Sequence, residues 1–226
     1  MDSKQRAGEW ASAQVKDGMS VGLGTGSTAA FFIRALARRV KEEKLNLRLI
    51  SSSFSTAILA GELGLTLLPF EDAVSLDLYA DGADEVDPGK RLIKGRGAAM
   101  VREKILVHIS KRFLVLVDPS KCVQRLGTNF PVPVECLPIA HRLVRRELES
   151  LGAGVVMRMA TEKDGPVVTD QGNFVLDARF PSTLDLAGLD GAIGAIPGVV
   201  GHGLFTRYAD RITVVIGHPD RLETVL

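Results

Sequence analysis

A turn rich in glycine and hydroxyl side chains, Gly22-Leu23-Gly24-Thr25-Gly26-Ser27-Thr28, has the chemistry to bind a phosphate group. Its alternate glycines let the backbone approach a ligand closely, and the helix predicted to begin near Thr28 presents unpaired N–H groups and its positive dipole end to an anion. The hydroxyls of Thr25, Ser27 and Thr28, together with these amides, suffice for one phosphomonoester. A capped strand-to-helix turn without a ligand is the alternative interpretation.

The same turn does not match the two common nucleotide-binding motifs. A dinucleotide site needs a third glycine where this chain has Ser27, and an acidic residue roughly 20 positions later, where the chain has Ser51-Ser52-Ser53. A P-loop needs a lysine at the position of Ser27 to reach the outer phosphates. We therefore expect a small phosphorylated molecule here, and neither NAD nor a nucleoside triphosphate.

A second segment with chemical potential is the acidic turn Asp81-Gly82-Ala83-Asp84-Glu85-Val86-Asp87, which follows a predicted strand. The EF-hand pattern fails, because Ala83 occupies the third ligand position and Val86 the position of the obligatory glycine. A solvated Asp-Gly turn is one interpretation. At the C-terminal end of a parallel strand, however, the carboxylates of such a turn can bind sugar hydroxyls or move protons.

The third segment is Lys94-Gly95-Arg96-Gly97 and the helix that follows it. Its two glycines again permit close backbone approach, and its lysine supplies a cation. Within the helix, Glu103 has only apolar neighbours three and four residues away, namely Ala99, Met100, Leu106 and Val107. Such a carboxylate either pairs with a residue from another element or has a raised pKa suited to accepting a proton near neutral pH.

The composition is that of a folded globular protein with small ligands. Hydrophobic residues make up 46% of the 226 residues, and 28 Lys and Arg nearly balance 27 Asp and Glu, so the broad basic field that favours nucleic-acid or membrane-surface binding is missing. Neither Cys122 and Cys136 nor the four histidines have metal-site spacing, so we expect reduced thiols, no metal and no cofactor. The polar N-terminus and the lack of any apolar stretch of ~18 residues predict a cytoplasmic location.

Strand-like and helix-like segments alternate in the first half of the chain. The predicted strands are Ser20–Leu23, Leu47–Ser51, Ser75–Ala80 and Phe113–Val117. The predicted helices are 4–16, Ala29–Val40, Thr56–Leu63 and Ala98–His108. This alternation predicts an α/β domain with a Rossmann-like, mostly parallel sheet flanked by helices, which binds ligands at the C-terminal ends of its strands.

After Lys121 the order of elements changes. The expected elements are an edge strand at Phe130–Glu135, a helix at Ala140–Leu151, strands at Val155–Met159 and Phe174–Arg179, a helix at Leu184–Ile193 and a strand at Val199–Thr206. This β-α-β-β-α-β order predicts an inserted, smaller α+β domain of the ferredoxin-like type. We therefore divide the chain into a Rossmann-like catalytic domain at 1–126 plus 206–226 and a small domain at 127–205, and we expect the strand Ile212–Ile216 to return to the first sheet.

Several motifs follow one another in a recognisable order and at recognisable separations. They are GLGTGST, SSS, DGADE, KGxGAA followed by REKI, and D-x-SK at Asp118–Lys121, with PVPVE, VVTDQGN and AIPGVVGHGLF further along. Each motif is weak alone, but five in register are specific. The sequence thereby resembles ribose-5-phosphate isomerase of the A type over essentially its whole length. The resemblance implies an isomerase of the pentose phosphate pathway that binds a phosphosugar, has no nucleic-acid or membrane partner and forms a homodimer or homotetramer.

The resemblance also implies roles for individual residues. The substrate would be held by Thr25, Gly26, Ser27 and Thr28, with Ser27 and Thr28 chiefly at its phosphate. Ring opening and the hydroxyl and carbonyl oxygens would be handled by Asp81, Asp84 and Lys94, and Glu103 would be the general base. Further substrate contacts are implied for Lys4, Gly82, Ala83, Gly95, Arg96, Gly97 and Lys121.

Arg96 departs from the family pattern, because relatives commonly have glycine at this position. If the position requires a positive φ angle, the arginine carries a strain cost. Otherwise its side chain points outward or adds a cation at the rim of the site.

An aldose is converted to a ketose either by a metal-assisted hydride shift or through an enediolate formed by a base. Since the sequence encodes no metal-ligand cluster, the enediolate route is favoured, with Glu103 moving the proton between C2 and C1 of ribose 5-phosphate. A phosphosugar sensor is one alternative, although we expect no DNA-binding module in the roughly 20 residues before the glycine turn. An amino-sugar phosphate deaminase or a CoA transferase on the same scaffold is another, against which the segment from Lys94 to Glu103 argues.

Overall fold

The structure is a computed structural model that describes residues 2–181 and 184–225. Its internal contacts divide the chain into two units. Unit 1 contains the chain up to Ala83, Arg102–Cys122 and the chain from Tyr208 onward, and unit 2 contains Asp84–Val101 and Val123–Arg207. The segment Asp84–Val101, which the sequence analysis places in the catalytic domain, thus has most of its contacts in unit 2. The domain limits at 126/127 and 205/206 stay predictions.

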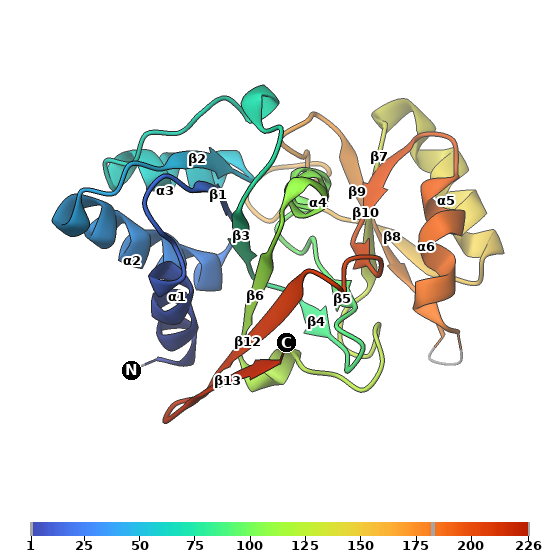
Figure 1. Ribbon diagram of the computed structural model, residues 1–226. Coiled ribbons are helices and arrows are strands. Elements are labelled where there is room, and N and C mark those ends of the chain that lie inside the picture. The colour runs from blue at the N-terminus through green and yellow to red at the C-terminus, as the bar shows by residue number, and fades with distance from the viewer. Residues whose placement is uncertain (1, 182–183, 226) are drawn as a thin grey trace. The chain divides into compact units, whose positions relative to one another are not determined.

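Unit 1 is built on a six-stranded sheet (Figure 1). Its strands are β1 (Ser20–Leu23), β2 (Arg48–Ser51), β3 (Leu78–Asp81), β6 (Phe113–Val117), β12 (Ile212–Gly217) and β13 (Leu222–Val225), in the order β13-β12-β6-β3-β1-β2. All neighbouring strands pair in parallel apart from β12 and β13. The mostly parallel sheet and the return of the last part of the chain to it are therefore confirmed, while β13 is an additional antiparallel edge that the sequence analysis did not anticipate.

Helices cover both faces of this sheet. They are α1 (Ser3–Ala13), α2 (Ser27–Glu43), α3 (Phe54–Glu62) and α4 (Met100–Ile109), with short 3-10 turns η1 (Phe70–Asp72) and η2 (Pro119–Lys121). α1, α2 and α3 share one apolar cluster with alternate residues of the strands, including Leu78 and Ala80. The residues between them face the opposite side of the sheet, where the rings of Tyr79 and Phe113 stack with their centroids 5.0 Å apart. α4 lies on this side (Figure 1).

The strand order creates a switch point between β1 and β3. The chain continues from β1 to β2 on one side of β1, and β3 and then β6 are added on its other side. In open sheets of this kind, ligands bind outside the carboxyl ends of the strands at such a point. The glycine turn follows β1, and Asp81 is the last residue of β3. Local sequence and topology therefore place both segments at the carboxyl ends of the strands, where sheets of this class bind ligands.

Unit 2 contains a four-stranded antiparallel sheet covered by two helices. Its elements are β7 (Val132–Cys136), η3 (Pro138–Ala140), α5 (His141–Ser150), β8 (Gly154–Met157), β9 (Phe174–Arg179), α6 (Leu186–Gly194) and β10 (Val199–His202), and the strand order is β10-β7-β9-β8. The apolar cluster includes Val134 and Leu176 of the sheet, Val144 and Leu148 of α5, and Ile193 of α6. The β-α-β-β-α-β chain order and the pairing confirm the ferredoxin-like domain.

Two expectations for this unit are wrong. The strand predicted at the sheet edge is β7, which pairs with β10 on one side and β9 on the other. Its Pro133 is tolerated because the register with β10 runs only from Val134 to Cys136, so the proline lies beyond that ladder. The single strand expected at Val199–Thr206 is instead divided into β10 and β11 (Leu204–Phe205), which belong to different sheets.

A small third sheet explains why Asp84–Val101 belongs to unit 2. It consists of β4 (Glu85–Val86), β5 (Leu92–Ile93) and β11, in the order β11-β5-β4, with both pairs antiparallel. Each strand has two residues, which is too short for a periodic pattern. The hairpin of β4 and β5 places Asp84 at its start and Lys94 at its end, and the Asp84 N–H donates to the carbonyl of Ile93 at 2.8 Å.

Candidate active site

The glycine turn of unit 1 is shaped by the Asp81 carboxylate. A side chain at Gly24 would place its Cβ 2.3 Å from the Asp81 carboxyl carbon, so only glycine fits there. The backbone N–H of Thr25 donates to Asp81 Oδ1 at 3.0 Å. Gly26 then takes a φ of 99° and becomes the N-cap of α2 without a side-chain cap. This 17-residue helix therefore begins directly after the glycine turn, which is the arrangement that an anion site requires.

The hydroxyl of Thr25 is engaged in a cluster of hydroxyl groups. Thr25 Oγ1 lies 2.7 Å from Ser52 Oγ and 2.8 Å from Ser53 Oγ, and Thr56 Oγ1 donates to the Gly24 carbonyl at 2.7 Å. Ser53 also caps α3 through the Thr56 N–H. Ser52 and Ser53, which follow β2, therefore support the glycine turn through their hydrogen bonds to the Thr25 hydroxyl.

Positive charge gathers near Ser27 and Thr28. The Lys4 ammonium donates to Ser27 Oγ at 3.0 Å, although the two residues are 23 positions apart. Asp118, next in the chain to η2, is partly desolvated, which would raise its pKa, but hydrogen bonds from Ser120 and the charges of Lys121 and Lys4 lower the pKa overall. Both lysines therefore act on one carboxylate of unit 1. Ser27 is exposed and Thr28 is partly exposed, so a ligand can reach them.

Asp81 is fully buried and accepts hydrogen bonds from several donors. Besides the Thr25 N–H, they are the Gly82 N–H at 2.7 Å and the Tyr79 hydroxyl. Burial, then the charges of Asp81 and Glu103, raise the pKa of the Tyr79 phenol well above its usual value, so this phenol stays protonated and donates to the carboxylate. Tyr79 was missed by the sequence analysis, because an aromatic residue within a buried strand has the pattern of a core residue.

Glu103 lies in the first turn of α4, and only 4% of its surface is exposed. Its charge acts on the Tyr79 hydroxyl, which in turn donates to Asp81. Within unit 1, therefore, the carboxylates of Glu103 and Asp81 share an electrostatic environment at the carboxyl end of β3. Two shielded carboxylates beside the glycine turn can divide proton transfer and hydroxyl binding between them.

The predicted site residues between Asp84 and Gly97 belong to unit 2. Lys94 is 3% exposed, its backbone N–H donates to Gly203 at 2.9 Å, and its ammonium lies 5.9 Å from the centre of the Phe205 ring. Asp84 Oδ2 accepts from the Arg96 N–H at 3.0 Å. The carboxylate at the start of the β4–β5 hairpin therefore stabilises the turn at its end.

Arg96 carries no backbone strain, because the positive φ angles of this turn are at Gly95, with 103°, and at Ala98, with 58°. The Arg96 side chain is exposed, and its guanidinium lies 4.9 Å from the centre of the Phe130 ring. Of the alternatives in the sequence analysis, the strain cost is thus excluded. The arginine supplies a cation stacked on an aromatic ring at the surface of unit 2.

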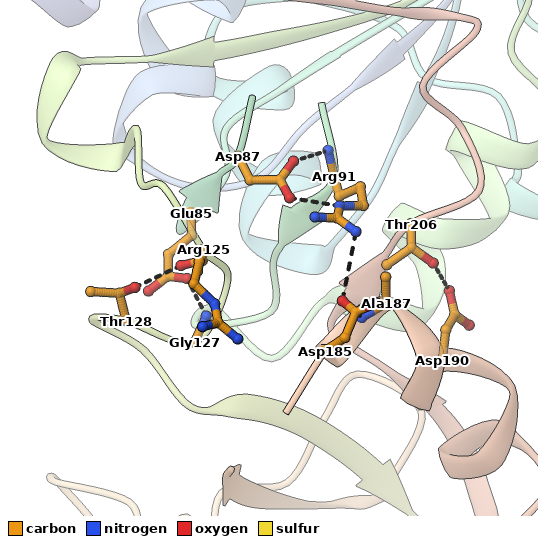
Figure 2. A network of polar contacts seen from close by, with 10 residues as sticks. All are labelled: Glu85, Asp87, Arg91, Arg125, Gly127, Thr128, Asp185, Ala187, Asp190 and Thr206. Atoms are coloured by element: carbon orange, nitrogen blue, oxygen red, sulfur yellow. Dashed lines mark hydrogen bonds and ion pairs between the residues drawn. The ribbon is translucent and has the colours of Figure 1, made fainter. Parts of the chain in front are cut away.

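Glu85 is a supporting residue that the sequence analysis left without a role. Its buried carboxylate accepts the backbone N–H groups of Gly127 at 2.6 Å, Asn129 at 2.5 Å and Phe130 at 2.9 Å. Figure 2 shows Glu85 beside Gly127, and Asp87 bonded to Arg91 on the same hairpin. The last acid of the DGADE motif therefore anchors the loop that carries Phe130.

The structure thus divides the predicted site residues between the two units. Lys4, Thr25, Gly26, Ser27, Thr28, Asp81, Gly82, Ala83, Glu103 and Lys121 belong to unit 1, and Asp84, Lys94, Gly95, Arg96 and Gly97 belong to unit 2. Across residues 2–181 and 184–225, no three His, Cys, Asp or Glu side chains are grouped as a metal site would require. None of the helices in that part of the chain combines the length and apolar character needed to cross a membrane.

Comparisons with known proteins identify the family and the fold. The family model described as ribose 5-phosphate isomerase A (phosphoriboisomerase A) matches residues 48–221. A ribose-5-phosphate isomerase A from Thermosynechococcus vestitus is 52% identical over 224 residues, which are 97% of this chain and 95% of the relative. The solved structure of ribose 5-phosphate isomerase A from Methanocaldococcus jannaschii is 42% identical with a TM-score of 0.93, covering 99% of this chain and 98% of its own. A D-ribose-5-phosphate isomerase solved in complex with phospho-erythronic acid is 36% identical with a TM-score of 0.92, covering 100% and 99%.

Proposed function

Because the chain belongs to the ribose 5-phosphate isomerase A family, we propose that it interconverts ribose 5-phosphate and ribulose 5-phosphate through an enediolate, with Glu103 as the general base. The observation that carries the proposal is the shielded Glu103 carboxylate, whose charge reaches the Tyr79 hydroxyl bonded to Asp81, at the edge of the sheet where the glycine turn begins α2. A carboxylate removed from bulk water is suited to accept a proton from carbon and return it.

The phosphate is the anchor in this proposal. The amides at the start of α2, with Ser27, Thr28 and the Lys4 ammonium, offer donors and positive charge to a phosphomonoester. Holding the substrate by a group remote from the reacting carbons fixes C1 and C2 against the base, and such positioning can lower the barrier by several kcal/mol. Lys121 adds positive charge, as its effect on Asp118 indicates.

The remaining steps concern oxygen atoms. Proton removal from C2 leaves negative charge on the carbonyl oxygen, and a cation or N–H donor must stabilise it; we assign this role to Lys94. Asp81 and Asp84 move the hydroxyl protons during ring opening and between O1 and O2. The proton that leaves C2 returns to C1 from Glu103, so atoms and charge balance without a redox partner.

The test is the variant Glu103→Gln, which keeps the shape of the side chain and removes the base. We expect turnover of ribose 5-phosphate to fall by a factor of about 100 to 10,000, the usual contribution of a general base, while phospho-erythronic acid still binds. Turnover is measured by the appearance of ribulose 5-phosphate, and binding by calorimetry.

Near-normal turnover in Glu103→Gln would remove Glu103 from this role. Inactivity of the wild-type protein on ribose 5-phosphate, with ammonia release from an amino-sugar phosphate or dependence on CoA, would contradict the proposed reaction itself.

A further inference from the structure

The turn Gly95–Gly97 of unit 2 is held from two sides. One peptide group, between Gly95 and Arg96, is bonded at both of its polar atoms: its N–H donates to Asp84 Oδ2 at 3.0 Å, and its carbonyl accepts from Arg158 Nη1 at 2.9 Å. The same Nη1 donates to the next carbonyl, that of Arg96, at 3.0 Å. A single guanidinium therefore bonds two successive carbonyl groups of the turn.

Arg158 is itself fixed in place. Its Nε donates to Asp177 Oδ2 at 2.9 Å and its Nη2 donates to Asp177 Oδ1, which makes a two-pronged pair with side chains only 16% and 22% exposed. Its backbone N–H donates to Val175 at 2.9 Å, and its carbonyl accepts from Val167 at 2.8 Å. The guanidinium therefore has little freedom to leave the turn.

This arrangement controls the direction of N–H groups. In a trans peptide the N–H is antiparallel to the carbonyl, and the described chain contains no cis peptide. Fixing the Arg96 carbonyl on Arg158 therefore also fixes the direction of the Gly97 N–H, which points away from the guanidinium. Gly95, which takes a φ of 103°, and Gly97, which is exposed, have no side chain that could hold the turn.

We infer that Arg158, held by Asp177, is a positioning residue that fixes the turn Gly95–Gly97 in the orientation that the isomerisation requires. The inference rests on the proposed function, because that function makes this turn part of the substrate site. One cavity of about 380 Å³ in unit 2 is lined by Arg158, Asp177, Asp84 and Arg96, among others. The Arg158–Asp177 pair, which we call the clamp, and the turn therefore face a common space. Lysine cannot replace the clamp fully, because it lacks the planar fork that bonds the carboxylate and the carbonyls together.

The chain offers a matched control in Arg39 of unit 1. Its Nε and Nη2 bond Glu43 at 2.7 Å each, and its Nη1 donates to the Val15 carbonyl at 3.0 Å and to the Ser12 carbonyl. Its side chain is 20% exposed, close to the 16% of Arg158. Arg39 thus has the same pattern of bonds at a place where no substrate residue is held.

The experiment compares Arg158→Ala, Arg158→Lys and Arg39→Ala in the full chain. We expect Arg158→Ala to lower kcat at least ~10-fold, since a small misplacement of a site can cost up to about 100-fold. KM should change less than kcat, Arg158→Lys should recover part of the loss, and Arg39→Ala should stay within about twofold of wild type. Amide hydrogen exchange of residues 94–98 should accelerate in Arg158→Ala and remain unchanged in Arg39→Ala.

The inference is overturned if Arg158→Ala loses no more kcat than Arg39→Ala, or if exchange at 94–98 is the same as in wild type. Thermal unfolding and the exchange of β6 in unit 1 show whether each variant is folded. If Arg158→Ala does not fold, the same comparison is made with Asp177→Asn, which removes the charge that holds the guanidinium. An inactive wild-type protein would refute the proposed function, and the exchange of residues 94–98 would still decide whether Arg158 orders the turn.

Discussion

The Asp81 carboxylate shows how single residues define the site in unit 1. It is fully buried, and its bonds to the Thr25 N–H, the Gly82 N–H and the Tyr79 hydroxyl supply the stabilisation that burial of a charge requires. The close packing of Gly24 against this carboxylate is the geometric condition for the Thr25 bond. The glycine is thus needed for space, since a Cβ has no room there.

This geometry predicts the effect of Gly24→Ala. The new methyl group would lie 2.3 Å from Asp81 Oδ1, and the carboxylate is held by its donors, so the turn or the carboxylate must shift. We expect a loss of about 1–3 kcal/mol in the free energy of unfolding, as for other overpacked sites, and a fall in kcat/KM of at least tenfold. Urea unfolding and steady-state kinetics measure the two effects.

Gly61→Ala is the matched control in the same unit. A Cβ at Gly61 in α3 meets no atom within 4 Å, so the substitution should be neutral or should stabilise the helix by about 0.5–1 kcal/mol. Equal behaviour of the two alanine variants would show that the close approach to Asp81 is unimportant.

Three strands of two residues each, β4, β5 and β11, form the small sheet of unit 2. β4 and β5 form a hairpin whose start is Asp84 and whose end leads into Lys94, and β11 adds to its other edge. Because strands this short contribute few ladder bonds, side chains must hold the surrounding loops. Glu85 does so by accepting N–H groups from the loop that precedes β7 (Figure 2).

We predict that Glu85→Gln loosens this loop. The amide has one acceptor oxygen and one NH2 group, so at least one loop N–H would face a donor in place of an acceptor. The expected loss in unfolding free energy is about 2 kcal/mol, typical for buried bonds to a charged group, with faster proteolysis within residues 123–131. Glu149→Gln, which removes an exposed partner of Arg145, should change stability by less than about 0.5 kcal/mol. Equal losses in both variants would contradict the anchoring role of Glu85.

The stability of the whole molecule should depend on pH through Glu135. This glutamate is fully buried on β7, and its Oε1 accepts from Thr169 at 2.8 Å and Asn173 at 2.9 Å. Its Oε2 has no hydrogen-bond partner among the described residues. Burial raises the pKa of the Glu135 carboxyl, against the hydrogen bonds that lower it. Since the folded pKa exceeds the unfolded one, folding favours the protonated form, and this stabilisation is lost as the pH rises through the folded pKa.

The variant Glu135→Gln tests this sign. Glutamine keeps an acceptor for Thr169 and Asn173 and does not titrate. The free energy of unfolding of Glu135→Gln minus that of wild type should therefore be larger at pH 7.5 than at pH 4. Urea unfolding at both pH values gives the comparison. A difference that is the same at both values, or larger at pH 4, would show that the fold does not raise the pKa of Glu135.

Much of the architecture could be predicted from short-range patterns. The strands Ser20–Leu23, Phe113–Val117 and Phe174–Arg179 begin and end as predicted, because continuous or alternating apolar residues bounded by polar ones specify a strand locally. The motif order indicated the family, and the β-α-β-β-α-β order indicated the ferredoxin-like unit. The substrate roles of individual residues stay predictions.

The amino-acid sequence by itself determined which residue types are available at which spacing: the glycine turn, the acidic turn, Glu103 with its apolar helical neighbours, and the family to which they point. Only the tertiary structure decided which of them meet. Thr25 bonds Asp81 across 56 positions, Glu85 bonds Asn129 across 44, and Arg158 bonds Gly95 across 63. Local periodicity reflects the geometry of one helix or strand, whereas such bonds depend on how the whole chain closes its sheets and buries its polar groups.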